Sequence, residues 1–272
     1  MSTIVSRPLV MIVAMDSELR HLHDLVPDWE DATDGVWPTL RTTHRGLELV
    51  VIRCGIGMVA AAAATEHAIA RFDPRWIMNF GCAGAHTREI LPGDVVIGTG
   101  LVAHGRMRIS ATEGIVPLTF GFTVAGEPKA RDGARTDPAL VALAEEATRE
   151  LPLDAWPEEF RLPAHAADGK VTVRTGVVAS ADIWMQDPAW LDRTHARTGS
   201  LCEDMEAAAI GQIAAHHDVP FLTIKDISNN EFHAVSAFEG TESALPVSEV
   251  GKRAAVLTVA TIDRLIDQCG AA

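Results

Sequence analysis

Residues 201–230 read LCEDMEAAAIGQIAAHHDVPFLTIKDISNN, and the fold class follows from this stretch. Its alanine-rich first half has apolar residues near a 3.6-residue period and the acids of C-E-D-M-E in the first turn, which predicts a helix. The β-branched run Val219–Ile227 predicts a strand covered on both faces. Because ligands bind at the carboxyl ends of strands in open α/β sheets, we expect chemistry at the polar triplet 228–230.

Strands and helices also alternate on both sides of this stretch, which is typical of α/β proteins. The predicted elements are strands at Leu9–Ala14, Leu47–Arg53, Trp76–Phe80, Asp94–Ala103 and Val171–Ser180, and helices at Asp16–Leu25, Met58–Arg71, Pro188–Ala196 and Val247–Cys269. Another helix is predicted to start at Asp137, an N-cap residue followed by proline. No internal repeat or polar linker divides the chain, so we expect one domain over residues 1–272.

Composition narrows the class of partner. The formal net charge of −14 and the isoelectric point near 5.1 disfavour nucleic acid and anionic membranes, because both would repel the protein. The apolar run Leu9–Met15 has no charged leader and is too short to span a bilayer, so we interpret it as a buried strand. A small neutral or cationic ligand fits this composition better.

The cysteines and histidines give no sign of a metal site. Cys54, Cys82, Cys202 and Cys269 lack C-x-x-C spacing, so neither a zinc site nor a disulfide framework is predicted. The eleven histidines form no H-E-x-x-H motif. We therefore expect no metal, no cofactor and a reducing, cytoplasmic location.

Two glycine-rich segments follow predicted strands. G-I-G at 55–57 opens a helix, where exposed amides can attract an anion, although a tight strand-to-helix turn explains these glycines equally well. G-C-A-G at 81–84 is predicted to be a turn at which backbone approaches another group closely.

Together, seven segments resemble the nucleoside phosphorylase-type α/β family, most of all its 5′-methylthioadenosine/S-adenosylhomocysteine nucleosidase branch. They are A-M-D-S-E at 14–18, G-I-G-M-V-A-A-A at 55–62, N-F-G-C-A-G at 79–84, L-P-G-D at 91–94, S-A-D-I-W-M at 180–185, D-M-E-A at 204–207 and I-S-N-N at 227–230. The resemblance implies a single-domain three-layer α/β/α sandwich around a mixed, partly barrel-like central sheet. It covers most of the chain apart from about 105–170, which we expect to be an insertion.

The resemblance also implies roles for individual residues. Glu18 matches the acid that positions the attacking water, Glu206 matches the acid that grips the ribose hydroxyls, and Trp184 matches the aromatic residue that stacks on the purine. The resemblance implies a supporting, substrate-binding role for Cys82, Ala83, Gly84, Met185, Met205, Lys225 and Ser228. It further implies a homodimer, because relatives complete the 5′ end of the pocket with a neighbouring subunit.

Hydrolysis is favoured over phosphorolysis. Family phosphorylases need cationic ligands for phosphate, often an arginine in the glycine turn, and here that place is Asn79. Breaking a ribose–purine bond develops oxocarbenium character, so the site needs a base for water and a group that stabilises positive charge. Glu18 and Glu206 suit these two tasks.

The main departure from the family pattern is Asn229. In adenine-releasing nucleosidases the corresponding residue is an acid that donates a proton toward N7, which an amide cannot do. Three interpretations remain open: Asn229 hydrogen-bonds N7 and O6 of a 6-oxopurine, the nearby Asp226 supplies the proton, or the protein binds a nucleoside and turns it over poorly. Strand alternation makes Asp226 point away from Asn229.

The sequence therefore predicts a cytoplasmic purine-nucleoside N-ribosyl hydrolase. A hydrolase for futalosine or another 6-oxopurine nucleoside is the alternative within this class. A catalytically weak purine-binding or storage-type protein is the alternative outside it.

Overall fold

The computed structural model describes residues 7–118, 122–124, 127–130, 134–153, 156–157, 171–238 and 246–270. Its helices are α1 (Asp16–Leu25), α2 (Met58–Phe72), α3 (Pro138–Glu150), α5 (Pro188–Thr198), α6 (Ala207–His216), α7 (Lys252–Gly270), η2 (Glu231–His233) and η3 (Val247–Glu249). Its strands are β1 (Leu9–Val13), β2 (Glu30–Asp31), β3 (Thr39–His44), β4 (Leu47–Arg53), β5 (Trp76–Ala85), β6 (Val95–Ala103), β7 (Met107–Ser110), β8 (Gly114–Pro117), β9 (Phe122–Val124), β10 (Glu127–Ala130), β11 (Val173–Ser180), β12 (Ser200–Asp204), β13 (Phe221–Asn230) and β14 (Val235–Ser236).

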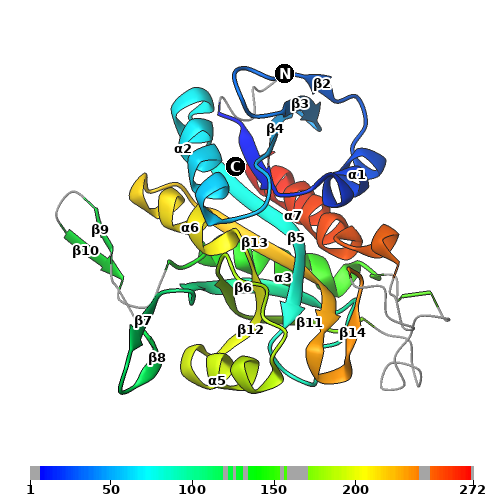
Figure 1. The fold of residues 1–272 in the computed structure, drawn as a ribbon. Helices are drawn as coiled ribbons and strands as arrows, with labels where there is room; N and C mark the ends of the chain where they lie inside the picture. The colour runs from blue at the N-terminus through cyan, green and yellow to red at the C-terminus, as the bar shows by residue number, and fades with distance from the viewer. Residues whose placement is uncertain are drawn as a thin grey trace.

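A ten-stranded mixed sheet forms the centre of the molecule, in the order β14-β13-β6-β11-β12-β5-β1-β4-β3-β2 (Figure 1). β13 pairs in parallel with β5 as well as with its neighbours in this order, so β13, β6, β11, β12 and β5 close into a ring. The predicted mixed, partly barrel-like sheet is confirmed. β7 with β8 and β9 with β10 form two separate hairpins.

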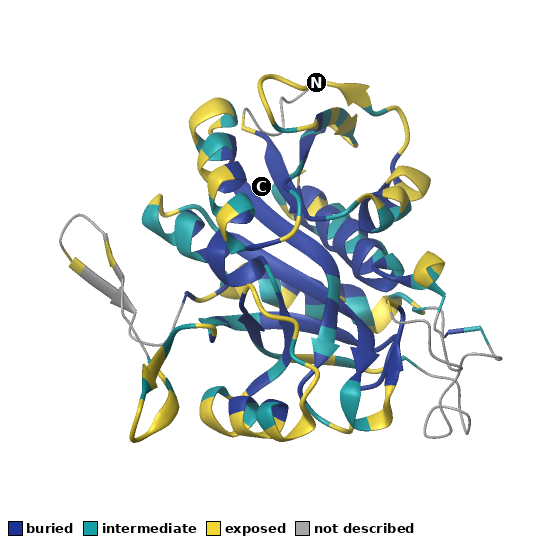
Figure 2. Ribbon diagram, in the orientation of Figure 1, coloured by how far each residue is buried: buried dark blue, intermediate teal, exposed yellow. Residues whose placement is uncertain are grey.

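Helices cover both faces of the sheet, as Figure 2 shows by the buried strands between half-exposed helices. Alternate residues of β1 show that each face of the sheet packs against its own set of helices. Leu9 and Met11 pack in one apolar cluster with α1, α3 and α7, whereas Val10 and Ile12 pack in a second cluster with α2 and α6. The three-layer sandwich expected from the sequence is therefore confirmed.

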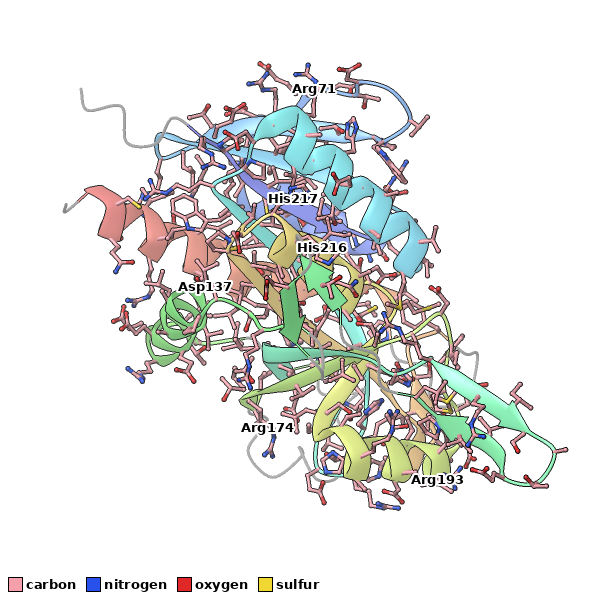
Figure 3. All side chains as sticks on the ribbon, turned by 90° about the vertical axis from the view of Figure 1, so that its left-hand side faces the viewer. Arg71, Asp137, Arg174, Arg193, His216 and His217 are labelled. Atoms are coloured by element: carbon pink, nitrogen blue, oxygen red, sulfur yellow. The ribbon has the colours of Figure 1, made fainter. Side chains whose placement is uncertain are left out.

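Several predicted boundaries agree closely with the structure. α1 and β4 have the predicted limits, and Asp137 caps α3 by accepting hydrogen bonds from the N–H groups of Ala139 and Leu140 (Figure 3). The closing helix starts at Lys252 rather than Val247, after the short helix η3. Part of the insertion predicted around 105–170 lies outside the described residues.

Two predictions near the carboxyl ends of strands were wrong. Glu203 and Asp204 were assigned to the first turn of a helix, but they end β12, and the helix α6 starts only at Ala207. The segment 81–84 was predicted to be a turn, but it continues β5. In both places, pairing between β12, β5 and β13 outweighs local preference, because closing the ring extends these strands.

Among the residues described, no helix is long and apolar enough to cross a membrane.

Candidate active site

Glu18 lies where the chain passes from β1 into α1, and only 3% of it is exposed. Its Oε2 accepts a hydrogen bond from the N–H of Met15 at 3.1 Å, and its Oε1 accepts one from the N–H of Cys82 at 2.8 Å. Gly81 permits this approach, because a Cβ there would lie 2.3 Å from Oε1. Backbone from two strand ends therefore fixes the carboxylate in one position.

The environment of Glu18 makes it a stronger base than a surface carboxylate. Burial raises the pKa of Glu18 above the ordinary value of 4.5, against the opposing effects of Lys225 and of the N–H groups of Cys82 and Met15. A raised pKa brings a carboxylate closer to the basicity that proton abstraction from water requires.

Glu206 is the second buried acid, at the N-cap position of α6. Its side chain makes no hydrogen bond to its own helix, and its Oε1 instead accepts one from the N–H of Gly57 at 2.8 Å. Burial and, next, the negative charge of Asp204 raise the pKa of Glu206 to about 8. The carboxyl group thus faces the start of α2 across the space between two helix ends.

One buried cation lies among these acids. Lys225 is 2% exposed, and its Nζ lies 2.7 Å from Oδ2 of Asp204. Burial alone would lower the pKa of Lys225, but the nearby charges of Asp204, Glu206 and Glu18 outweigh burial and raise it. The ammonium group therefore stays charged and partly balances the three carboxyl groups.

Aromatic and amide side chains also belong to the site. Trp184 is 49% exposed and packs edge-on against Phe238, with ring centroids 6.4 Å apart. On β13, the hydroxyl of Ser228 lies 3.0 Å from Oδ1 of Asn229 and 3.2 Å from the carbonyl oxygen of Ala83. An exposed ring face thus stands near a buried amide.

These groups line one cavity of about 240 Å³. The structure brings most of the predicted site residues to its wall, namely Glu18, Cys82, Ala83, Gly84, Trp184, Met205, Glu206, Ser228 and Asn229. One cavity therefore holds the two buried acids Glu18 and Glu206 together with an aromatic ring and an amide.

Three predicted residues do not line this cavity. Lys225 lies behind Asp204, and Met185 contributes its backbone N–H to Oε1 of Glu203 at 3.1 Å. Asp226 is fully buried, and its Oδ2 accepts a hydrogen bond from the N–H of Arg253 at 2.9 Å. Burial raises the pKa of Asp226 to about 7. The structure thus keeps Asp226 away from the cavity that holds Asn229.

The remaining lining residues were missed from the sequence. They are Ala14, Met15, Ile56, Glu203, Asp204 and Phe238. Several lie inside the quoted motifs and could have been found there. Glu203 was hidden by its assignment to a helix, and Phe238 follows β14, where no motif marks it.

Asn79, which replaces the expected arginine of a phosphorylase, lies inside the sheet rather than in the cavity wall. Its amide donates to the carbonyl oxygen of Ile12 at 2.9 Å and accepts from the hydroxyl of Thr223 at 2.8 Å. Among the residues described, no group of three or more potential metal ligands is positioned to hold a metal ion.

Comparison with known sequences identifies the family of this chain. The sequence profile of the Phosphorylase superfamily matches residues 8–266. The chain is 28% identical over 222 residues to a 5′-methylthioadenosine/S-adenosylhomocysteine nucleosidase of Geobacillus sp. (strain WCH70), covering 81% of this chain and 84% of the relative. It is 29% identical over 222 residues to the nucleosidase of the same name from Bacillus thuringiensis (strain Al Hakam), covering 81% and 85%.

Solved structures with the same fold include two from Helicobacter pylori. A variant of its MTAN, with 5′-methylthioadenosine in the active site, has a TM-score of 0.75 and 20% identity, over 96% of this chain and 100% of that one. The futalosine hydrolase of strain 26695 has a TM-score of 0.74 and 20% identity, over 95% and 98%. With a family profile spanning nearly its whole length, this chain belongs to the phosphorylase superfamily.

Proposed function

We propose that this protein is an enzyme that hydrolyses the N-glycosidic bond of a purine nucleoside, releasing the free base and a ribose derivative. The observation that carries the proposal is the pair of buried acids, Glu18 and Glu206, in one cavity with an exposed tryptophan face. The relatives support the proposal, because they are 5′-methylthioadenosine/S-adenosylhomocysteine nucleosidases and a futalosine hydrolase.

Glu18 acts as the general base. Its carboxylate takes a proton from a water molecule as the water attacks the anomeric carbon, while the bond between that carbon and the purine breaks. The purine leaves with the bonding electron pair and takes up a proton from solvent. The two backbone N–H groups that bind Glu18 hold it in place before the substrate arrives. Such positioning removes part of the entropic barrier of the reaction.

Glu206 binds the sugar. Its carboxyl group accepts hydrogen bonds from the 2′- and 3′-hydroxyls, and these bonds strengthen as the ribose ring gains positive charge. The contact with the N–H of Gly57 uses one lone pair of Oε1, so the other oxygen remains available for hydroxyl groups.

Water rather than phosphate is the nucleophile. Helix N-termini offer amides to phosphate, but at the start of α2 the N–H of Gly57 donates to Glu206 and that of Met58 donates to Oδ1 of Asp182 at 2.7 Å. These two side chains already occupy the donors, so a phosphate would have to displace them. Asn79 stands where family phosphorylases often have a phosphate-binding arginine. Its side-chain amide is hydrogen-bonded to Ile12 and Thr223 within the sheet.

We further propose that the protein is a cytoplasmic homodimer. Each chain would form one domain over residues 1–272, with an insertion around 105–170. Four free cysteines suit a reducing compartment. Two hairpins, β7–β8 and β9–β10, stand outside the central sheet within the proposed insertion. Exposed apolar side chains near the cavity, Ile56, Val59 and Phe238, suit coverage by a second copy.

The test is base release from purified protein in phosphate-free buffer. The substrates are methylthioadenosine, inosine and futalosine, and free base is measured by chromatography. We expect stoichiometric base and sugar from at least one of them. Tight nucleoside binding without base release would instead favour a storage-type protein.

A further inference from the structure

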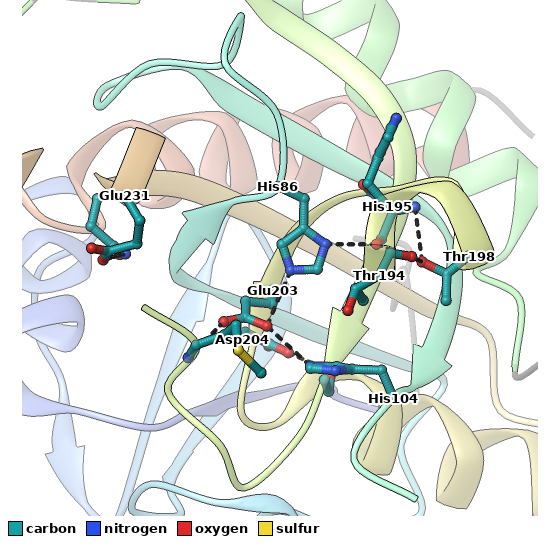
Figure 4. A network of polar contacts seen from close by, with 12 residues as sticks. His86, His104, Thr194, His195, Thr198, Glu203, Asp204 and Glu231 are labelled. Atoms are coloured by element: carbon teal, nitrogen blue, oxygen red, sulfur yellow. Dashed lines mark hydrogen bonds and ion pairs between the residues drawn. The ribbon is translucent and has the colours of Figure 1, made fainter. Parts of the chain in front are cut away.

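The proposed mechanism does not use all of the buried ionisable side chains. His86 and His104 flank Glu203 in the cavity wall, and the Nε2 atoms of both lie 3.1 Å from its Oε2 (Figure 4). Asp226 and Arg253 lie outside the cavity wall, where β13 meets the start of α7. This second pair reaches the proposed base through the backbone of α7.

The start of α7 packs directly against Glu18. Gly251, the residue before this helix, has a φ of +79°, and a Cβ there would lie 3.2 Å from Cγ and 3.3 Å from the α-carbon of Glu18. Its carbonyl oxygen accepts a hydrogen bond from the N–H of Ala255 at 2.9 Å, so Gly251 is fixed to the first turn of the helix. A movement of this helix end would therefore change the space around the base.

Asp226 attaches the same helix end to the sheet. Its Oδ2 accepts a hydrogen bond from the N–H of Arg253, two residues after Gly251, at 2.9 Å. The first N–H groups of a helix have no partner within the helix, so a buried helix end needs an acceptor of this kind. Asp226 is also in register with Cys82 of β5, whose N–H donates to Glu18. One side chain thus connects the helix end with the strands that hold the base.

The side chain of Arg253 adds to this attachment. Its guanidinium is 1% exposed, with Nη2 3.0 Å from Oε2 of Glu249 and Nη1 3.9 Å from Oδ2 of Asp226. Its Cζ lies 5.1 Å from the centre of the Trp156 ring. Separating a buried guanidinium from its carboxylates is costly, so these contacts resist a shift of the helix end.

We propose that Asp226, together with Arg253, is a positioning residue that holds the start of α7 against Glu18 and so keeps the base oriented and shielded from water. This inference rests on the proposed function, in which Glu18 is the general base. Asp226 itself lies outside the cavity wall and acts through Gly251, which contacts Glu18.

Two properties of Glu18 depend on this contact. Burial is the largest cause of the raised pKa of Glu18, and packing against Gly251 is part of that burial. Water entering beside Glu18 would lower its pKa toward 4.5, because Lys225 and the N–H groups of Cys82 and Met15 already act in that direction. A loosened carboxylate would also lose its orientation, and a misplacement of about 1 Å can cost about 100-fold in rate.

The first arm of the test compares Asp226→Ala with Asp226→Asn and with Asp137→Ala. Asparagine keeps an acceptor for the N–H of Arg253, whereas alanine removes it. Asp137 is the matched control, because its side chain accepts hydrogen bonds from the start of α3 and lies outside the cavity wall.

We expect Asp226→Ala to lower kcat about 10- to 100-fold with little change in KM, because the defect lies in the chemical step. Asp226→Asn should restore most of this rate equally for all nucleosides, and Asp137→Ala should match the wild type. Wild-type kcat in a folded Asp226→Ala would overturn the proposal.

The pH profile separates positioning from loss of stability. A variant that is merely less stable has less active enzyme, but its base keeps the same pKa. The acidic limb of kcat/KM should therefore move to lower pH in Asp226→Ala and stay in place in Asp137→Ala. A lower rate with an unmoved acidic limb would reduce Asp226 to a structural role and contradict the proposal.

Gly251→Ala perturbs the same contact and leaves the buried charges paired, so it decides the question if Asp226→Ala does not fold. The added Cβ would lie 3.2 Å from Cγ of Glu18, which must move. The control is Gly46→Ala in the turn between β3 and β4, where φ is also positive and no atom lies within 4 Å of the added Cβ. We expect kcat to fall only in Gly251→Ala, and equal rates in the two variants would refute the contact.

The two proposals fail separately, because the pKa of Glu18 can be measured without substrate. The measurement is an NMR titration of isotope-labelled glutamate carboxyl groups, with the Glu18 signal assigned by Glu18→Gln. If no purine nucleoside is hydrolysed but this pKa falls in Asp226→Ala, the proposed function fails and positioning stands. If nucleosides are hydrolysed, and neither kcat nor this pKa changes in Asp226→Ala, hydrolysis stands and positioning fails.

Discussion

Glu18→Gln is the substitution that removes the proposed base with the least change of shape. The N–H groups of Met15 and Cys82 bind different oxygens of Glu18, so the variant keeps one of these two hydrogen bonds and turns its NH2 group toward the other donor. It cannot take a proton from water. Glu18 acts as the general base in the chemical step and does not contact the ligand strongly. We therefore expect turnover to fall and ligand binding to remain largely intact.

The expected loss follows from the role of a positioned base. General base catalysis contributes about 10²- to 10⁴-fold, so kcat should fall by that factor, or about 3–5 kcal/mol. Gly81→Ala is an independent perturbation, because its Cβ would lie 2.3 Å from Oε1 and must displace the carboxylate. Single-turnover base release and calorimetric binding to both variants separate chemistry from affinity.

The pH profile supplies a second readout for the same group. Burial raises the pKa of Glu18, and the base works only when ionised, so wild-type kcat/KM should fall as pH decreases through a value above 4.5. That acidic limb should be missing in Glu18→Gln. Near wild-type kcat in Glu18→Gln, with the acidic limb retained, would refute the assignment of the base.

Three further outcomes are expected. The pKa of Glu206 is raised to about 8, so its protonated form stabilises the fold fully below about pH 4.5, and this stabilisation is lost as pH rises through about 8. Melting temperatures measured between pH 5 and 9 should therefore fall more steeply for the wild type than for Glu206→Gln, and parallel profiles would contradict the buried environment of this acid. Asn229→Asp should raise kcat/KM for adenine nucleosides relative to 6-oxopurine nucleosides by about one to two orders of magnitude, because the new carboxyl group can protonate N7. Asp226→Asn should leave this preference unchanged, since Asp226 is bonded to the start of α7, and loss of adenine release in Asp226→Asn would reverse the two assignments. Light scattering at micromolar concentration should give at least twice the chain mass of 29.1 kDa, and the monomer mass would exclude a stable dimer.

The layers and most of the sheet could be predicted because their patterns are local. The strand β1 is a continuous apolar run, and the helix α1 starts immediately after it at Asp16, so both were found within a residue of their limits. The N-cap of α3 was found for the same reason, since Asp137 and the proline after it act on their own turn.

The closed end of the sheet could not be predicted from local patterns. Glu203 and Asp204 resemble the acidic first turn of a helix, yet pairing with β5 makes them the end of a strand. That difference moves Glu203 from a solvated helix end into the cavity wall, between His86 and His104. These histidines come from distant parts of the chain, and no spacing in the sequence relates them to Glu203.

The structure separates Asp226 from Asn229, as the sequence predicts, but not by simple strand alternation. Asp226 lies against Arg253 and Asn229 lies in the cavity. Between them the register of β13 shifts, and the adjacent Ser228 and Asn229 both line the cavity. Sequence alone could not show what each side chain meets there, because α7 follows only after a separate segment.

The central claim is that water, held by Glu18, attacks the sugar. The most direct measurement is the identity of the sugar product when the protein cleaves its best purine nucleoside in the presence of saturating phosphate, followed by phosphorus NMR. The account predicts free ribose or its 5′-substituted analogue, at a rate that phosphate does not increase. Sugar 1-phosphate as the principal product would contradict it.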